Sequence, residues 1–134
     1  MVPTLLDTDV LSEVLKGKQR QIARTAERYI REHQRFTFSA ITLYEIERGL
    51  LAKQATRLIA QFQAIEQAST VLPVTVPILR RAARLWADAK AGGQPQNDAD
   101  LLIAATAMEH GLSLATGNQR HFDWIAGLQL ESWA

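Results

Sequence analysis

Acidic residues occur as two close pairs in this sequence, Asp7 with Asp9 and Asp98 with Asp100. Carboxylates that lie close together raise each other's pKa unless a cation neutralises them. A divalent cation can do this, and it can also polarise a phosphoryl oxygen, activate water and orient a phosphate. The chain has no cysteine, so a metal must be held by oxygen or imidazole ligands, which favours Mg2+ or Mn2+. The acids therefore indicate a metal-dependent phosphodiesterase.

The elements that would position these acids are short apolar runs alternating with longer helical patterns. A first short strand is expected to end at Leu5-Leu6. Further strands are expected at 36–39, 71–74 and 113–116, with an edge strand at 128–133. Helices are expected over the remaining periodic segments, which are 9–15, 19–33, 42–53, 56–68, a helix opened by Pro77 and ended by Gly92, and 98–110. This alternation predicts an α/β fold, a parallel sheet sandwiched by helices.

Polar residues follow the ends of several of these strands. Residues 7–9 follow the first strand, 42–45 follow the second, and Asn118 comes just after the strand at 113–116. Ligands bind beyond the carboxyl ends of the strands in open α/β sheets. We therefore expect these three groups to converge on one edge, where residues 97–100 can join them from the start of their helix.

Most of these polar residues also have a purely structural interpretation. Asp9, Asn97 and Asp98 stand where helix N-caps belong. Thr42 and Glu45 have the spacing of a capping box, as do Asn97 and Asp100. Asp7 is harder to explain in this way. An acid directly after a strand has no free helix N–H group to bind unless it is itself the N-cap residue.

Length and charge place further bounds on the protein. The 134 residues fit one domain, 1–134, and the formal net charge is +1. Seven Lys or Arg residues nevertheless lie between Lys16 and Arg35, against two acids. They could line an RNA phosphate track, but the solvated face of a helix is the favoured interpretation. No apolar run approaches about 18 residues and no signal peptide is visible, so we expect a cytoplasmic protein without membrane contact.

Four motifs resemble those of PIN-domain ribonucleases, most closely the VapC-type toxins of type II toxin–antitoxin systems. Residues 5–12 resemble the opening motif, with Asp9 in place of the usual Asn, and residues 41–49 resemble the second, with Glu45 at its acidic position. Residues 98–105 resemble the third motif in a register that selects Asp100. Residues 114–122 resemble the fourth, in which Asn118 matches and His121 replaces the expected acid.

The resemblance implies a PIN-like three-layer α/β/α sandwich with a short, mostly parallel central sheet. It further implies a ribonuclease that hydrolyses RNA with Mg2+ or Mn2+. For VapC-type proteins it also implies a homodimer, inhibition by a cognate antitoxin protein, and a tRNA substrate.

Residue roles follow from the same resemblance. Asp7 and Asp100 would hold the metal, and Glu45 would complete the acidic pocket and orient or deprotonate the attacking water. Asp98 would be a helper or a cap. The residues that would hydrogen-bond metal-bound water or the scissile phosphate are Thr8, Thr116 and Asn118. Because His121 replaces an acid, one firmly bound ion is predicted.

Three alternatives remain open at this point. Asp7-Thr8-Asp9 also fits the opening motif of haloacid-dehalogenase-like phosphatases, in which Asp7 would be the nucleophile, although the rest of that pattern fits poorly. A receiver-like domain would need a phosphoacceptor Asp where Thr75 follows a strand. The third alternative is a catalytically inactive PIN-fold RNA-binding module, which His121 keeps open.

Overall fold

A five-stranded, wholly parallel sheet forms the centre of the molecule in a computed structural model that describes residues 1–93 and 96–134. The strand order is β3-β2-β1-β4-β5. The strands are β1 (Thr4–Leu6), β2 (Thr37–Ser39), β3 (Thr70–Leu72), β4 (Ser113–Ala115) and β5 (Leu130–Glu131). The predicted parallel sheet and its C-terminal edge strand are therefore confirmed. Because β1 lies at the centre, the residue that follows it faces the ends of β2 and β4.

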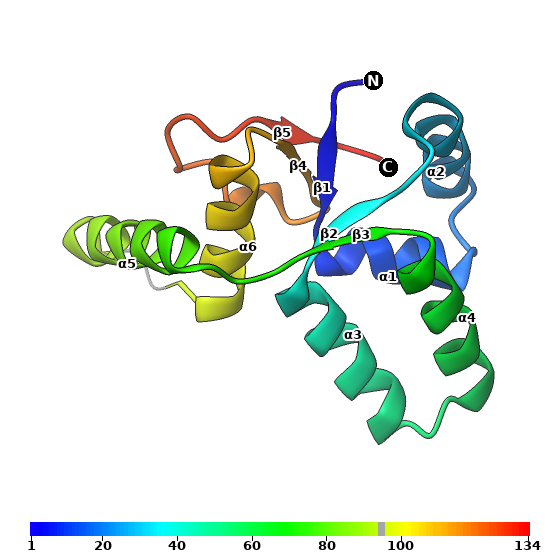
Figure 1. Ribbon diagram of the computed structural model, residues 1–134. Helices are drawn as coiled ribbons and strands as arrows, with labels where there is room; N and C mark the ends of the chain where they lie inside the picture. The colour runs from blue at the N-terminus through cyan, green and yellow to red at the C-terminus, as the bar shows by residue number, and fades with distance from the viewer. Residues whose placement is uncertain (94–95) are drawn as a thin grey trace.

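Helices cover both faces of the sheet, as Figure 1 shows. Leu6 and Phe38 point to a core shared with α1 (Thr8–Lys16), α2 (Arg20–His33), α3 (Ala40–Ala52) and α4 (Thr56–Gln67). Leu5 and Leu114 point to the opposite core, which α5 (Val76–Ala91) and α6 (Asp98–Glu109) complete. Neighbouring strand residues face opposite sides of a sheet, so one short strand supplies both cores. The three-layer α/β/α sandwich is confirmed.

The start of α3 differs from the expected one. The helix begins at Ala40, and the hydroxyl oxygen of Ser39 accepts a hydrogen bond from the Ile41 amide at 3.0 Å. Ser39 ends β2, so it can cap the helix as soon as the strand stops. The capping box predicted for Thr42 and Glu45 is therefore wrong, because Thr42 lies within the helix and its side chain is buried.

Of the other residues predicted to cap helices, one does so and two do not. Asp7 caps α1, so the N-cap interpretation of Asp9 is wrong. Asn97 caps α6, as predicted, through a hydrogen bond of 2.8 Å from the Asp100 amide to its side-chain oxygen. Asp98 is the first residue of that helix and not its cap.

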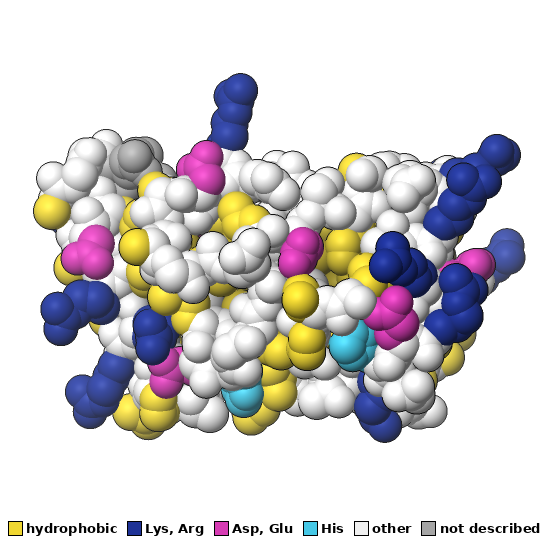
Figure 2. Space-filling model, turned by 90° about the horizontal axis from the view of Figure 1, so that it is seen from above, with side chains coloured by type: hydrophobic (Ala, Val, Ile, Leu, Met, Phe, Trp, Pro, Cys, Tyr) yellow, Lys and Arg dark blue, Asp and Glu magenta, His cyan; other side chains and the backbone are white. Residues whose placement is uncertain are grey.

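Charged side chains are distributed unevenly over the surface. In the view of Figure 2, Lys and Arg side chains lie mainly towards the two ends of the face shown, while acidic and histidine side chains are interspersed among uncharged ones. In the described part of the chain, no helix combines the length and apolar character needed to cross a bilayer.

Candidate active site

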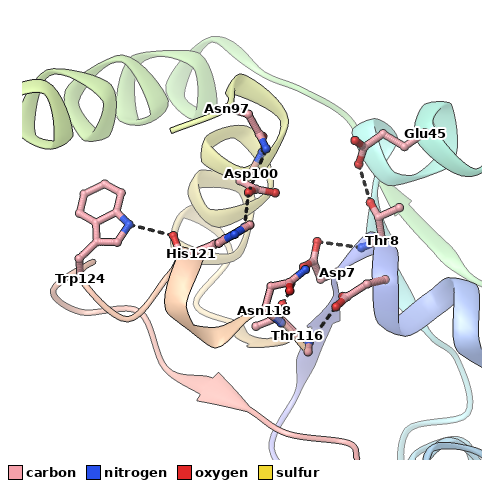
Figure 3. A network of polar contacts seen from close by, with 11 residues as sticks. Asp7, Thr8, Glu45, Asn97, Asp100, Thr116, Asn118, His121 and Trp124 are labelled. Carbon is pink, nitrogen blue, oxygen red and sulfur yellow. Dashed lines mark hydrogen bonds and ion pairs between the residues drawn. The ribbon is translucent and has the colours of Figure 1, made fainter. Parts of the chain in front are cut away.

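The site is centred on Asp7, at the carboxyl end of the central strand (Figure 3). Its backbone amide donates to the carbonyl oxygen of Ala115 at 2.9 Å, which places Asp7 beside the end of β4. Oδ1 accepts the Thr8 amide and Oδ2 accepts the Thr116 hydroxyl, both at 2.8 Å. The side chain is only 5% exposed. A carboxylate is thus held in a fixed orientation in a largely dry environment.

This environment disfavours the charged form of Asp7. Burial and, to a smaller extent, the negative charge of Asp9 raise the pKa of Asp7 to about 7, although the hydrogen bonds from Thr116 and Thr8 oppose the shift. A buried acid with a strongly perturbed pKa is a common mark of a functional site. A bound cation would reverse the effect, because it favours the ionised carboxylate.

Glu45 joins the site through Thr8. The Thr8 hydroxyl donates to Oε1 of Glu45 at 2.6 Å and lies 3.0 Å from the Thr42 hydroxyl. Thr8 has one hydroxyl hydrogen, so Thr42 must be the donor in its contact with Thr8. Oε2 of Glu45 lies 3.9 Å from the Arg48 guanidinium. The sequence motif placed Glu45 at this edge, but this hydroxyl chain was not predicted.

Asp100 approaches from the start of α6, which contacts α3. Its Oδ2 accepts a hydrogen bond from Nδ2 of Asn97 at 3.2 Å and lies 3.1 Å from Nδ1 of His121. The His121 carbonyl oxygen in turn accepts the Trp124 indole N–H at 2.8 Å. His121 therefore lies beside an acid of the site. In Figure 3, Asp100 and His121 face the same part of the strand edge as Asp7, with Glu45 on the other side.

The loop after β4 supplies the remaining polar groups. The Asn118 amide donates to the Thr116 hydroxyl oxygen at 3.0 Å, and the Gly117 amide donates to Oδ2 of Asp9 at the same distance. Asn118 and Thr116 were expected here. The contact between Gly117 and Asp9 was not, and the sequence signal for it is only the glycine between two motif residues.

Asp98 lies in different surroundings from Asp100. It is exposed and lines a groove between α5 and α6, together with Leu79, Trp86 and Leu102. The structure thus brings Asp7, Thr8 and Glu45 into one network, whereas it places Asp98 beside an apolar surface.

Comparison with known proteins identifies the family. The PIN domain profile matches residues 4–128. The chain belongs to the PIN-domain family. It is 34% identical over 134 residues to "VapC ribonuclease Y4jK" of Sinorhizobium fredii (strain NBRC 101917 / NGR234), with 94% of each chain covered. It is 27% identical over 135 residues to "tRNA(fMet)-specific endonuclease VapC" of Shigella flexneri, with 100% of both chains covered.

Solved structures agree with this assignment. A DNA-bound VapBC structure from Salmonella typhimurium has a TM-score of 0.88 and 28% identity, with 100% of both chains covered. The predicted resemblance to VapC-type PIN domains is therefore confirmed. Membership of the PIN-domain family, with relatives named as VapC ribonucleases, decides against the phosphatase and receiver alternatives.

The donor set of this PIN domain suits a hard divalent cation. Within residues 1–93 and 96–134, no three Asp, Glu or His side chains come close enough to form a complete metal-binding group. The acids at the edge nevertheless offer carboxylate oxygens, which Mg2+ and Mn2+ prefer. Asp7 is buried in a place that penalises its charge, and a cation would remove that penalty. On this ground the residues present fit a divalent ion.

Proposed function

We propose that this PIN domain is the toxin of a toxin–antitoxin pair and that it hydrolyses RNA phosphodiester bonds with Mg2+ or Mn2+, tRNA being its substrate. The observation that carries the proposal is the buried carboxylate of Asp7, whose pKa is raised to about 7 at the carboxyl edge of the sheet. A structural cap does not require burial of this kind, since exposed caps serve equally well.

Asp7 and Asp100 would hold the ion, each through a carboxylate oxygen. When bound, the ion would polarise the scissile phosphate and lower the pKa of a water molecule. The Thr116 hydroxyl and the Thr8 amide hold the Asp7 carboxylate in one orientation. Asn97 and His121 do the same for Asp100.

Glu45 would orient or deprotonate the attacking water. Its Oε1 is occupied by the Thr8 hydroxyl, so Oε2, which faces Arg48, is the oxygen left to accept a proton from water. Asn118 is exposed beside the site and is suited to donate from its side-chain amide to a phosphate oxygen. Asp98 would act only indirectly, since it lies in the groove between α5 and α6.

The names of the relatives support the substrate and the partner. A relative that aligns over the full length of both chains is named as a tRNA(fMet)-specific endonuclease, and the Salmonella typhimurium neighbour is a VapBC structure bound to DNA. We therefore assign this chain a tRNA substrate and an antitoxin partner. Exposed apolar side chains on α5, which are Val76, Leu79 and Trp86, support a homodimer through that face.

The test is cleavage of tRNA by the purified protein with Mn2+ and with Mg2+. We expect cleavage that EDTA abolishes and that Asp100→Asn reduces by about a hundredfold or more, which is typical for loss of a group that stabilises the transition state. Asp88→Asn, an exposed acid on α5, is the control with the same charge change. RNA binding without cleavage in every metal would instead support the inactive RNA-binding alternative.

A further inference from the structure

Asp9 has no role among the residues assigned to the metal or the substrate, yet its side chain reaches across to the loop after β4. Its Oδ1 accepts the Val10 amide at 2.8 Å, within the first turn of α1. Its Oδ2 accepts the Gly117 amide at 3.0 Å. The two residues are 108 positions apart in the chain. One carboxylate therefore ties α1 directly to the loop.

The absence of a side chain at Gly117 has a specific cause. A Cβ atom added there would lie 2.8 Å from Oδ2 of Asp9, closer than real Cβ atoms approach a neighbour. The φ angle of Gly117 is not in the left-handed region, so its backbone is one that other residues can adopt. A side chain at position 117 would therefore displace the Asp9 carboxylate from its contact with the loop.

The loop held in this way carries groups that touch both proposed metal ligands. Thr116, directly before Gly117, donates to Asp7, and the Asn118 amide, directly after it, donates to the Thr116 hydroxyl oxygen. Further along, Nδ1 of His121 lies against Asp100. Gly117 itself is exposed, so its amide would meet water if Asp9 did not accept from it.

We propose that Asp9 is a positioning residue: through the Gly117 amide it clamps the loop after β4 and so holds Thr116 and Asn118 in place at Asp7. The clamp needs an accepting oxygen at position 9 and no side chain at position 117. It does not need a charge, so asparagine at position 9 serves as well. The consequence for cleavage rests on the proposed ribonuclease function, whereas the clamp itself does not.

The first experiment measures the clamp without RNA. Hydrogen exchange of the Gly117 amide is followed by NMR in EDTA for the parent, Asp9→Ala and Asp9→Asn. Loss of a hydrogen bond to a charged group should speed exchange in Asp9→Ala by about tenfold or more, while Asp9→Asn stays close to the parent. Asp123→Ala, an exposed acid nearby, is the control with the same charge change. Equal exchange in all four proteins would overturn the proposal.

The second experiment is a double-mutant cycle on tRNA cleavage at about pH 8. Gly117→Ala should lower kcat about tenfold in the parent, because its Cβ meets Asp9, but should change kcat less than about twofold in Asp9→Ala. KM should move little, and Asp9→Asn should restore most of the kcat lost in Asp9→Ala. An equal effect of Gly117→Ala in both backgrounds would overturn the clamp. A protein that cleaves no RNA would refute the proposed function and leave the exchange result standing.

Discussion

At the scale of single residues, the site depends on a carboxylate kept where its charge is unfavourable. The pKa of Asp7 is raised from 3.8 to about 7, so the folded state binds its proton more tightly than the unfolded chain does. The resulting stability is fully present below about pH 4 and is lost as the pH rises through about 7. The ionised, metal-binding form of Asp7 is therefore also the form that destabilises the fold.

Asp7→Asn should consequently be more stable than the parent at pH 8 in EDTA, by up to a few kcal/mol, since one pKa unit corresponds to about 1.4 kcal/mol. Asparagine can still cap α1, so the advantage should vanish near pH 4. Mn2+ should raise the Tm of the parent and leave the variant unchanged, and cleavage should be abolished in the variant. Thermal unfolding from pH 4 to pH 8 measures the difference, and a parent more stable than the variant at pH 8 would contradict it.

His121 stands where the fourth motif has an acid, and the structure puts it against Asp100. Neutral imidazole adds no charge to the site and suits Mg2+ poorly. Because Mn2+ accepts imidazole more readily, the parent should prefer Mn2+ to Mg2+. His121→Asp should tighten metal binding and narrow that preference. Calorimetric titration with both ions measures this, with His110→Asp, an exposed histidine directly after α6, as the control. Identical stoichiometry and affinity in the parent and in His121→Asp would place His121 outside the metal site.

At the scale of elements, two hydroxyl groups near the start of α3 are expected to have different roles. Ser39 caps the helix, whereas Thr42 donates to Thr8 in the site. Ser39→Ala removes the helix cap and should cost about 0.5–2 kcal/mol while leaving kcat nearly unchanged. Thr42→Val keeps the shape of a buried side chain but removes the donor to Thr8, so it should lower kcat severalfold with a smaller loss of stability. Urea unfolding and cleavage rates of the two variants provide the comparison. If Thr42→Val lost only stability, the hydroxyl chain to Glu45 would have no part in turnover.

Much of this arrangement could be predicted from periodicity and strand ends. The alternation of strands and helices was sufficient for the parallel sheet, and the motif register placed Asp7, Glu45 and Asn118 at one edge. The start of α3 could not be predicted in this way, because Ser39 and Thr42 are both good caps and only the end of β2 decides between them. The Asp9–Gly117 contact joins positions 108 residues apart, so no local pattern contains it.

At the scale of the whole molecule, the second half of the basic stretch, in the C-terminal part of α2, lies away from the active edge. The C-terminal part of α2 adjoins the start of the chain, because Glu32 pairs with the amino group of Met1 and His33 lies 2.8 Å from its carbonyl oxygen. Arg28 is exposed and pairs with Glu32 at 3.4 Å. Residues near Met1 precede β1, whereas Asp7 follows it (Figure 1). The solvated-face interpretation is the one that this geometry supports.

Reversal of Arg24 and Arg28 to Glu should therefore leave the salt dependence of RNA binding unchanged. Arg48→Gln, beside Glu45, should instead reduce the slope of log K against log salt by about 0.7, the value for one phosphate contact on a single strand. Binding of a tRNA fragment to metal-free protein at several salt concentrations would measure both slopes. A smaller slope of log K against log salt in the variant with both Arg24 and Arg28 changed to Glu would show that the basic stretch contacts RNA phosphates.

The sheet order also governs when the site can exist during synthesis. Asp7 leaves the ribosome early, but its partner Thr116 is 109 residues later in the chain, and β1 pairs with β4 only after that segment has emerged. Trp133 then packs against Tyr29 and Phe36, closing one core. Contacts this distant in sequence form late, because the chain must lose the entropy of closing a long loop before the contacts can stabilise it. A nascent chain therefore carries Asp7 and Asp9 without the loop that orients them until β4 and the residues after it have been made and can pair with β1.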